Sequence, residues 1–230
     1  MIKRIINTIA GCLGIKRRMF IAPAADKPVP ASISYAITVC NEAEALCTLL
    51  DFLQPYLQPG DEIIVQADRK NVTAEVQQVV QGHTHLIRRY VEHDLDYDFA
   101  RAKNHLNTQC CGEWIFQLDA DECPQTSLLQ ALPAILQANP GVELYKMPRM
   151  NSFVDGQGRT EKEYVAWPDY QGRLYRNAPQ RIRWHRPIHE KIRGHKAYVY
   201  LPKEEKYAIR HRKVTEQDKA KWQNWRQHYT

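Results

Sequence analysis

The sequence predicts an α/β fold, in which a mainly parallel sheet is covered by helices on both faces and a β-rich C-terminal half is appended. One observation is the size of the chain: its 230 residues are 43% hydrophobic and 25% charged, which suits one globular domain with a substantial core. The other is a regular alternation, up to about residue 140, of β-rich apolar runs with segments of helical spacing. Such alternation is typical of right-handed βαβ units.

Four pairs of a strand and a helix make up this alternating part. Each expected strand is a short run rich in β-branched, aromatic and other apolar residues, and each expected helix repeats apolar residues every three or four positions. In chain order the elements are strand Ser32–Val39, helix Glu42–Leu57, strand Asp61–Ala67, helix Val72–Gln81, strand Thr84–Val91, helix Tyr97–Gln109, strand Glu113–Leu118 and helix Pro124–Ala138. We expect Pro124 in the first turn of the last helix, where proline is well tolerated.

Beyond residue 140 short strands replace this alternation. They are expected at Val142–Met150, Gln171–Tyr175, Arg181–Trp184 and Lys196–Leu201, before a terminal helix at Thr215–His228. We therefore divide the chain into a leader with its linker, residues 1–30, and a single domain, residues 31–230. The domain comprises the alternating half (31–140), the β-rich half (141–213) and the C-terminal helix (214–230).

The formal net charge of +6 is unevenly distributed. Counting Lys and Arg against Asp and Glu, residues 1–30 carry +5, residues 31–130 carry −9 and residues 131–230 carry +10. This pattern indicates that different surfaces meet different partners. No apolar run reaches the roughly 20 residues of a membrane-spanning helix, so a polytopic membrane protein is excluded.

The leader combines apolar residues at mostly helical spacing with a basic cluster, Lys16, Arg17 and Arg18. No small-residue cleavage site of a secretory signal precedes that cluster. Two interpretations stay open for residues 1–18: a basic amphipathic helix on an anionic membrane surface, or a helix packed on its own domain or on a partner. A proline-rich linker follows at Ala22–Ala31.

None of the six cysteines belongs to a CxxC pair or has a Cys/His spacing typical of zinc sites. Several lie in apolar stretches, where a free cysteine packs as a small core residue. We therefore expect reduced structural thiols in a cytoplasmic protein.

Three acidic residues, Asp119, Asp121 and Glu122, directly follow the expected strand Glu113–Leu118. Carboxylates crowded at the end of a buried strand repel one another, and a divalent cation would relieve that repulsion. Mg²⁺ or Mn²⁺ takes one or two protein carboxylates and completes its shell with water and phosphate oxygens. The motif alone is weak, because a solvated loop can carry the same residues.

Polar residues near other strand ends strengthen this interpretation. Thr38, Asn41 and Glu42 lie at and beyond the end of the first strand, Asp68 follows the second, and the segment DFARAKN (98–104) precedes the fourth. Ligands of such sheets bind beyond the carboxyl ends of the strands, so these groups can converge on one crevice.

The ordered motifs TVCNE, Asp68, DFARAKN and GEWIFQLDADE resemble those of inverting family 2 glycosyltransferases with the glycosyltransferase-A fold. The resemblance covers residues 33–135 and extends through WPDYQGRLYR (167–176) and His189-Glu190. It implies metal-dependent transfer of a sugar from a nucleotide-diphospho-sugar to an acceptor hydroxyl. It also implies that residues 31–140 bind the donor and residues 141–213 bind the acceptor.

The resemblance further implies roles for single residues. Donor binding falls to Thr38, Asn41 and Glu42 at the nucleoside, to Asp68 near the base or ribose, and to Arg101, Lys103, Asn104 and Asp119 at the nucleotide or diphosphate. The implied metal ligands are Asp119, Asp121 and His189. The family's V-D-(D/S)-G-S-T-D pattern reads V-Q-A-D-R-K-N here, so Asp68 has a second interpretation as part of a turn before the next helix.

Sugar transfer also needs a base that deprotonates the acceptor. The candidates are Asp169 and Glu190, and the side chains of His189 and Glu190 can diverge on a turn, toward the metal and toward the acceptor. Arg173 and Arg176 are either phosphate contacts or arginines on a strand surface.

The acceptor stays open at this point. Residues 181–213 carry eleven Lys or Arg against three acids, with aromatic residues between them, which suits an acidic glycan, an anionic lipid or a nucleic acid. We expect a cell-envelope saccharide or lipid-linked glycan, with the protein peripheral at the inner face of the membrane. The alternatives are a glycosyltransferase acting on nucleic acid, such as a modified DNA base, and a non-catalytic nucleotide- or nucleic-acid-binding domain of the same fold.

Overall fold

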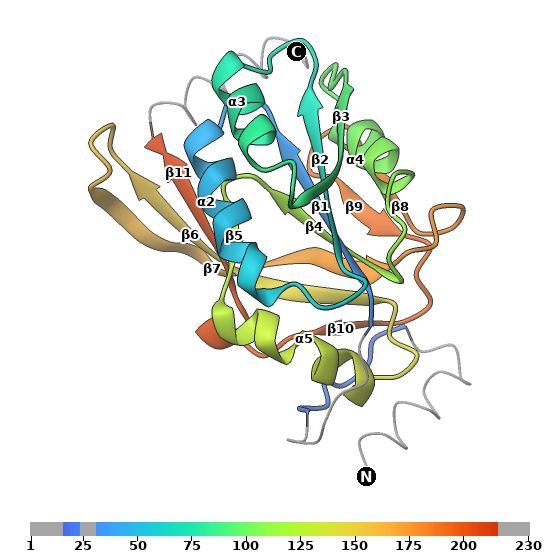
Figure 1. Cartoon of the computed structure of the whole chain (residues 1–230). Helices are drawn as coiled ribbons and strands as arrows, with labels where there is room; N and C mark the ends of the chain where they lie inside the picture. Colours follow the sequence, from blue (N-terminus) through green and yellow to red (C-terminus); the bar gives the residue numbers. More distant parts are fainter. Residues whose placement is uncertain (1–15, 24–30, 216–230) are drawn as a thin grey trace.

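The computed structural model describes residues 16–23 and 31–215, which form one large sheet with helices on both of its faces (Figure 1). The strands are β1 Ile33–Val39, β2 Glu62–Asp68, β3 Ile87–His93, β4 Trp114–Asp119, β5 Glu122–Pro124, β6 Leu144–Val154, β7 Thr160–Arg176, β8 Arg183–His185, β9 Lys191–Arg193, β10 Tyr198–Tyr200 and β11 Ile209–Val214. The helices are α2 Ala43–Leu53, α3 Ala74–Gly82, α4 Phe99–Asn107 and α5 Thr126–Ala138, with 3₁₀ turns at Gln54–Tyr56 and Glu205–Tyr207.

The alternating half folds as predicted. Strands β3, β2, β1 and β4 lie side by side in that order and are all parallel. Helices α2, α3 and α5 share one hydrophobic core with one face of the sheet, and α4 packs with the β8–β9 hairpin on the other face. In α2 the buried residues are Leu46, Leu49, Leu50 and Leu53, a spacing that places them on one side of a helix.

Strands β6, β7, β10 and β11 of the β-rich half continue the same sheet, whereas β8 and β9 form a separate two-stranded sheet. Strand β7 pairs antiparallel with β4, β6 pairs with β7, and β11 and β10 pair with β6. Strands β6 and β7 form one long hairpin whose tip projects beyond the helices (Figure 1). The strand expected at Gln171–Tyr175 is therefore too short, and Trp167 to Tyr170, which precede it, also lie within β7.

Two smaller predictions also differ from the structure. Pro124 ends the short strand β5, and α5 begins at Thr126, because β5 pairs with the distant strand β11. Strands β9 and β11 were not expected at all.

Residues 16–23 lie against the domain. The Arg18 N–H donates to the Tyr198 carbonyl, and the Tyr198 N–H donates to the Lys16 carbonyl, so this segment adds to the edge at β10. Asn139 exchanges two hydrogen bonds with the backbone of Ile21. The helix expected within residues 1–18, on a membrane surface or packed on protein, and the expected terminal helix Thr215–His228 fall largely outside the described residues. Within the described ranges, no helix is long and apolar enough to cross a membrane.

Candidate functional site

The acidic motif lies where β4 ends, next to the end of β1. In the register of this parallel pair Thr38 faces Asp119, and the Thr38 hydroxyl donates to Asp119 Oδ1 over 2.8 Å. Asp119 is the last residue of β4 and Glu122 the first of β5, so the three acids occupy the connection between two strands. The sheet therefore fixes the positions of these carboxylates.

Two cations hold the Asp119 carboxylate. Arg173 on β7 contacts Oδ2 at 2.8 Å, and Lys103 on α4 lies 3.3 Å from Oδ1. Burial acts to raise the pKa of Asp119, but the attraction of Lys103 and Arg173 outweighs it and holds the pKa well below its usual range. Asp119 is therefore ionised at neutral pH.

Glu122, unlike Asp119 and Asp121, is a buried partner of two arginines. Its side chain is fully buried, and Oε1 accepts hydrogen bonds from Arg173 at 2.5 Å and from Arg149 at 2.9 Å. A buried carboxylate needs such partners because desolvation otherwise destabilises its charge. Glu122 thus anchors two arginines, which come from β6 and β7, under the acidic turn.

A chain of hydrogen bonds joins Asp121 to Asp169. His211 Nε2 lies 3.2 Å from Asp121 Oδ2, and His211 Nδ1 lies 2.8 Å from Asn151 Oδ1. The Asn151 amide donates in turn to Asp169 Oδ2 over 3.0 Å. Arg149 contacts the same oxygen at 2.6 Å, which closes the network back to Glu122.

Glu190 enters the site from the loop between β8 and β9. Its Oε1 lies 2.7 Å from Lys103 Nζ, and Lys103 is itself buried, with its ammonium 4.9 Å from the centre of the Trp184 ring. Burial acts to raise the pKa of Glu190, but the charge and hydrogen bond of Lys103 outweigh it, so the pKa lies below its ordinary value. Glu190 is therefore a carboxylate that can accept a proton.

The described residues of this network carry charges of both signs. Five carboxylates, Asp119, Asp121, Glu122, Asp169 and Glu190, contact Lys103, Arg149, Arg173 and His211. The repulsion expected among three adjacent acids is thus reduced by the protein's own arginines and lysine. The Asp121 carboxylate is nevertheless an oxygen ligand of the kind that Mn²⁺ and Mg²⁺ prefer, together with phosphate and water oxygens, and the His211 imidazole lies beside it as a second donor.

Six of the predicted residues meet in this network: Thr38, Lys103, Asp119, Asp121, Asp169 and Glu190. Three residues were missed, Arg149, Asn151 and His211. They lie on β6 and β11, and only the order of strands in the sheet brings them to the acidic turn. Local sequence gives no signal for them, because their positions depend on the pairing of strands that are distant in the chain.

Two other predicted residues, Glu42 and Asp68, form hydrogen bonds within the loops that follow β1 and β2. The Glu42 carboxylate accepts hydrogen bonds from the backbone of Cys40 and Asn41 just before α2. The Asp68 carboxylate accepts from the Asn71 amide and from the Leu95 N–H, and so ties the loops after β2 and β3 together. Their roles at the nucleoside stay predictions.

The remaining predicted residues lie outside the network. Arg101 pairs with Asp96 at 2.8 Å on the surface. The Asn104 amide donates to the Trp184 carbonyl and accepts from the Trp184 N–H, both at 2.9 Å. His189 has a φ of 52°, and its role as a metal ligand stays a prediction.

Comparison with known proteins identifies the family to which the chain belongs. Residues 34–217 match the family described as "Glycosyl transferase family 2", well over half of the chain. No curated protein matches the sequence.

Several solved structures have a similar fold. They include the mannosyltransferase PcManGT from Pyrobaculum calidifontis in complex with GDP-Man and Mn²⁺, at 20% identity and a TM-score of 0.42, over 66% of this chain and 43% of that one. S. aureus TarS 1-349 in complex with UDP is similar at 15% identity and a TM-score of 0.43, over 64% of this chain and 47% of that one. Glucosyl-3-phosphoglycerate synthase from Mycobacterium tuberculosis has 15% identity and a TM-score of 0.39, over 56% and 44% of the two chains. The present chain therefore matches less than half the length of each.

Proposed function

Because the chain belongs to glycosyl transferase family 2 and has the glycosyltransferase-A fold, we propose that it moves a sugar from a nucleotide-diphospho-sugar to an acceptor hydroxyl, with inversion at the anomeric carbon. The observation that carries the proposal is the network at the end of β4. It joins carboxylates to a lysine and two arginines, and in it the Asp121 carboxylate and the His211 imidazole lie 3.2 Å apart, close enough to share one divalent cation.

Asp121 and His211 would hold a Mn²⁺ or Mg²⁺ ion. When bound, the ion supplies Lewis-acid stabilisation of the negative charge on the leaving diphosphate. Thr38, Lys103 and Arg173 hold Asp119 in place beside this pair, and Asn151 fixes the tautomer of His211 by binding its other ring nitrogen. The buried ammonium of Lys103 adds positive charge on the same side.

Glu190 is the better candidate for the base. Only its Oε1 is held by Lys103, whereas Asp169 accepts from Arg149 and Asn151 on Oδ2 and from Gln171 on Oδ1. A carboxylate with both oxygens engaged by donors is a poor proton acceptor. We assign Glu190 to deprotonation of the acceptor hydroxyl and Asp169 to positioning of Arg149 and Asn151.

For the acceptor we favour a cell-envelope saccharide or lipid-linked glycan, which fits a cytoplasmic protein that is peripheral at the membrane. The basic surface is the support: Arg17, Lys146 and the rings of Tyr198 and Tyr200 form cation–π contacts at the edge of the sheet. A nucleic-acid acceptor is the second candidate, and residues 181–213 favour it through their charge. Co-sedimentation with anionic vesicles against a salt-sensitive shift of labelled DNA separates the two.

The direct test is release of a nucleoside diphosphate from a panel of nucleotide-sugars with Mn²⁺ and cell-extract acceptors. Release that depends on Mn²⁺ is expected. In addition, Asp121→Ala and His211→Ala should each abolish metal-dependent nucleotide binding, because they remove the two proposed ligands, whereas Asp155→Ala at the tip of the β6–β7 hairpin should not.

Two results would contradict this assignment. If no nucleotide-sugar of the panel released its nucleoside diphosphate, the proposed enzyme activity would be overturned in favour of a binding domain of the same fold. Unchanged Mn²⁺-dependent nucleotide binding in both ligand variants, with circular dichroism showing an intact fold, would mean that the cation binds elsewhere.

A further inference from the structure

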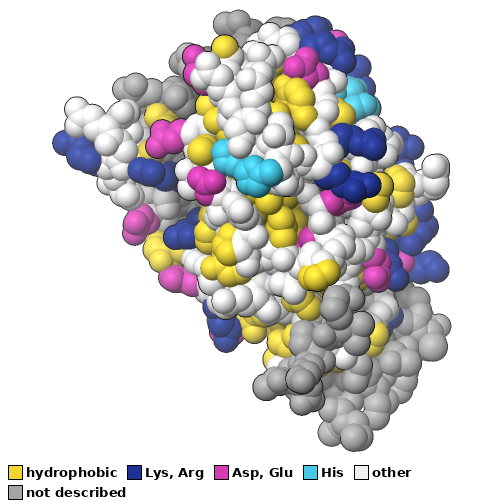
Figure 2. All heavy atoms as spheres, viewed as in Figure 1, with side chains coloured by type: hydrophobic (Ala, Val, Ile, Leu, Met, Phe, Trp, Pro, Cys, Tyr) yellow, Lys and Arg dark blue, Asp and Glu magenta, His cyan; other side chains and the backbone are white. Residues whose placement is uncertain are grey.

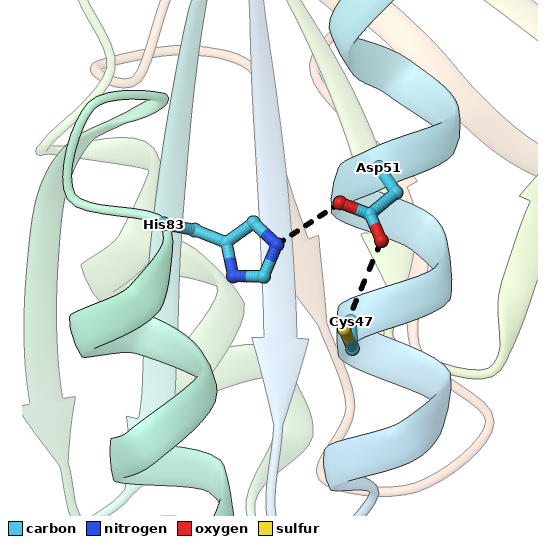
Figure 3. A group of neighbouring side chains, drawn as sticks. All are labelled: Cys47, Asp51 and His83. Atoms are coloured by element: carbon cyan, nitrogen blue, oxygen red, sulfur yellow. Dashed lines mark hydrogen bonds and ion pairs between the residues drawn. The ribbon is translucent and has the colours of Figure 1, made fainter.

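A second group of metal-ligating side chains lies on the outer face of α2 and α3, outside the network of Asp119. Figure 3 shows Cys47, Asp51 and His83 turned toward one another, with the carboxylate between the imidazole and the sulfur. His83 Nε2 lies 3.1 Å from Asp51 Oδ1, and Cys47 Sγ lies 3.9 Å from Asp51 Oδ2. One ligand atom from each residue lies within 4.8 Å of the other two.

The fold brings these residues together for simple reasons. Cys47 and Asp51 are four residues apart in α2, so their side chains share one face of the helix. His83 directly follows α3, and its N–H caps that helix by donating to the carbonyls of Val79 and Val80. Both helices pack on the same hydrophobic core, which fixes the spacing between them (Figure 1).

The orientation of the His83 ring is also fixed. Nδ1 lies 2.7 Å from the Val79 carbonyl oxygen and donates to it, so Nε2 is the nitrogen that faces Asp51. In the neutral ring this nitrogen is an electron-pair donor. It lies 3.1 Å from Asp51 Oδ1, close enough for both atoms to bind one metal ion. A backbone carbonyl that orients an imidazole in this way is the usual outer contact of a metal-bound histidine.

We propose that Cys47 Sγ, Asp51 and His83 Nε2 bind one divalent transition-metal ion of the zinc class. A thiolate ligand favours such ions over Mg²⁺ and Mn²⁺, which prefer oxygen. The half-exposed position leaves a fourth place for water, and Figure 2 shows histidine side chains at the surface of this face, beside an acidic one. Such a site was not foreseen from the cysteine spacing, because its ligands come from two helices.

The proposed site lies away from the sugar-transfer site. His83 precedes β3, at the amino end of the parallel strands, whereas Asp119 and Thr38 lie at their carboxyl ends. A metal ion there would join α2 to α3 and stabilise the folded chain by binding it preferentially. The inference does not depend on the proposed glycosyl transfer.

Titration of the full chain with Co²⁺ tests the proposal, because thiolate coordination gives a charge-transfer band that oxygen and nitrogen ligands do not. One equivalent of Co²⁺ should produce the band, and Zn²⁺ should displace it. Cys47→Ser should abolish the band and His83→Ala should weaken Co²⁺ binding at least about tenfold. The matched controls are Cys111→Ser, an exposed cysteine on another face, and His85→Ala, whose ring stacks on that of His83.

A thiolate band that persists in Cys47→Ser, or a wild-type chain that gives no band, would overturn the proposal. A second measurement covers any variant that folds poorly. Zn²⁺ should raise the Tm of the wild type, of Cys111→Ser and of Asp121→Ala, but not that of Asp51→Asn. Equal shifts in Asp51→Asn and the wild type would also overturn it.

Discussion

Glu190 and Asp169 are two carboxylates of one network whose oxygens are used differently. Glu190 is held at one oxygen by the buried ammonium of Lys103, while Asp169 is held at both by Arg149, Asn151 and Gln171. In both cases burial acts to raise the pKa, the nearby cation outweighs it, and the pKa falls below its ordinary value. The two residues are therefore not distinguished by their ionisation. They are distinguished by the number of carboxylate oxygens that accept hydrogen bonds from the protein, one in Glu190 and two in Asp169.

Replacement of Glu190 by Gln should lower kcat by about 10²–10⁴-fold, the usual contribution of a general base. Gln still reaches Lys103 but cannot accept the acceptor's proton, so nucleotide binding should change little. Transfer assays at saturating donor, combined with titration of the nucleoside diphosphate and Mn²⁺, measure the two quantities separately.

Asp169→Asn is the matched variant. It keeps the shape of the side chain and weakens its hold on Arg149 and Asn151, so we expect its main effect on metal affinity through His211. If instead Asp169→Asn lost the larger part of kcat and Glu190→Gln kept it, the two roles would have to be exchanged.

Among the elements, the β8–β9 hairpin decides where Glu190 lies. Asn104 on α4 holds both the N–H and the carbonyl of Trp184 in β8, and the Trp184 indole N–H donates to the Tyr175 hydroxyl over 3.0 Å. The Phe99 N–H at the start of α4 donates to the Pro187 carbonyl. The hairpin is thus fastened to α4, the helix that also carries Lys103.

Asn104→Ala tests whether this residue contacts the donor, as its resemblance to the family motif implies, or positions the hairpin. Loss of two hydrogen bonds to backbone groups should lower the free energy of unfolding by about 1–3 kcal/mol. If Asn104 positions the hairpin, kcat should fall while the affinity for nucleoside diphosphate and Mn²⁺ stays at the wild-type value. A loss of nucleotide affinity with unchanged stability would identify Asn104 as a donor contact. Urea unfolding and nucleotide titration give both numbers, and Asn41→Ala, before α2, serves as a control for stability.

Local sequence pattern predicted some elements better than others. Strands β1, β2, β3 and β4 are continuous apolar or β-rich runs between helices of regular spacing, so their type could be predicted. Strand β11 reads IRHRKV, and β5 has only three residues. Strand β5 forms because it pairs with β11, and β11 forms because it pairs with β5 and β6. That contribution comes from tertiary context and is invisible to local pattern.

The same distinction applies to the candidate site. Asp119 and Asp121 could be predicted because they directly follow a buried strand, and Lys103 because it belongs to a motif in the same half. Arg149 and His211 could not, since 26 or more residues separate them from Asp121 and Glu122 and only the sheet order β7-β6-β11-β5 brings them near. Long-range pairing supplied the residues that give the acidic turn its partners.

For the whole molecule, the charge pattern of the sequence has a structural counterpart. The acidic segment 31–130 and the basic segment 131–230 are joined by ion pairs: Arg173 to Asp119 and Glu122, Arg149 to Glu122, and Arg176 to Glu113. Part of the excess of each segment is therefore neutralised inside the fold. The two segments do not simply form a separate acidic donor site and a basic acceptor surface.

These contacts also determine how stability depends on pH. Although burial opposes it, nearby cations lower the folded-state pKa values of Asp119, Asp169 and Glu190 below those of unfolded carboxyls, about 4. Burial, followed by neighbouring positive groups, lowers the pKa values of His105 and His195 below about 6.5. For these five groups the unfolded chain binds more protons than the folded one, so their contribution to the free energy of unfolding rises with pH, whereas Asp61, whose pKa burial raises, acts in the opposite direction.

We therefore expect stability to fall in two stages on acidification. The histidine contribution is complete above about pH 6.5 and is lost as the pH falls through the folded-state values, and the carboxylate contribution is complete above about pH 4 and is lost below it. Urea unfolding at pH 8, 5.5 and 4 should give a lower free energy at each step, with a further fall below pH 4. His105→Gln should flatten the first stage because Gln carries no titrating ring but can still donate to Gln66, the present partner of His105, whereas the surface variant His85→Gln should leave it unchanged. If the free energy of unfolding instead increased as the pH was lowered from 8 to 5.5, the histidines would bind protons more tightly in the folded chain than in the unfolded one. Their folded-state pKa values would then be raised, which contradicts the prediction.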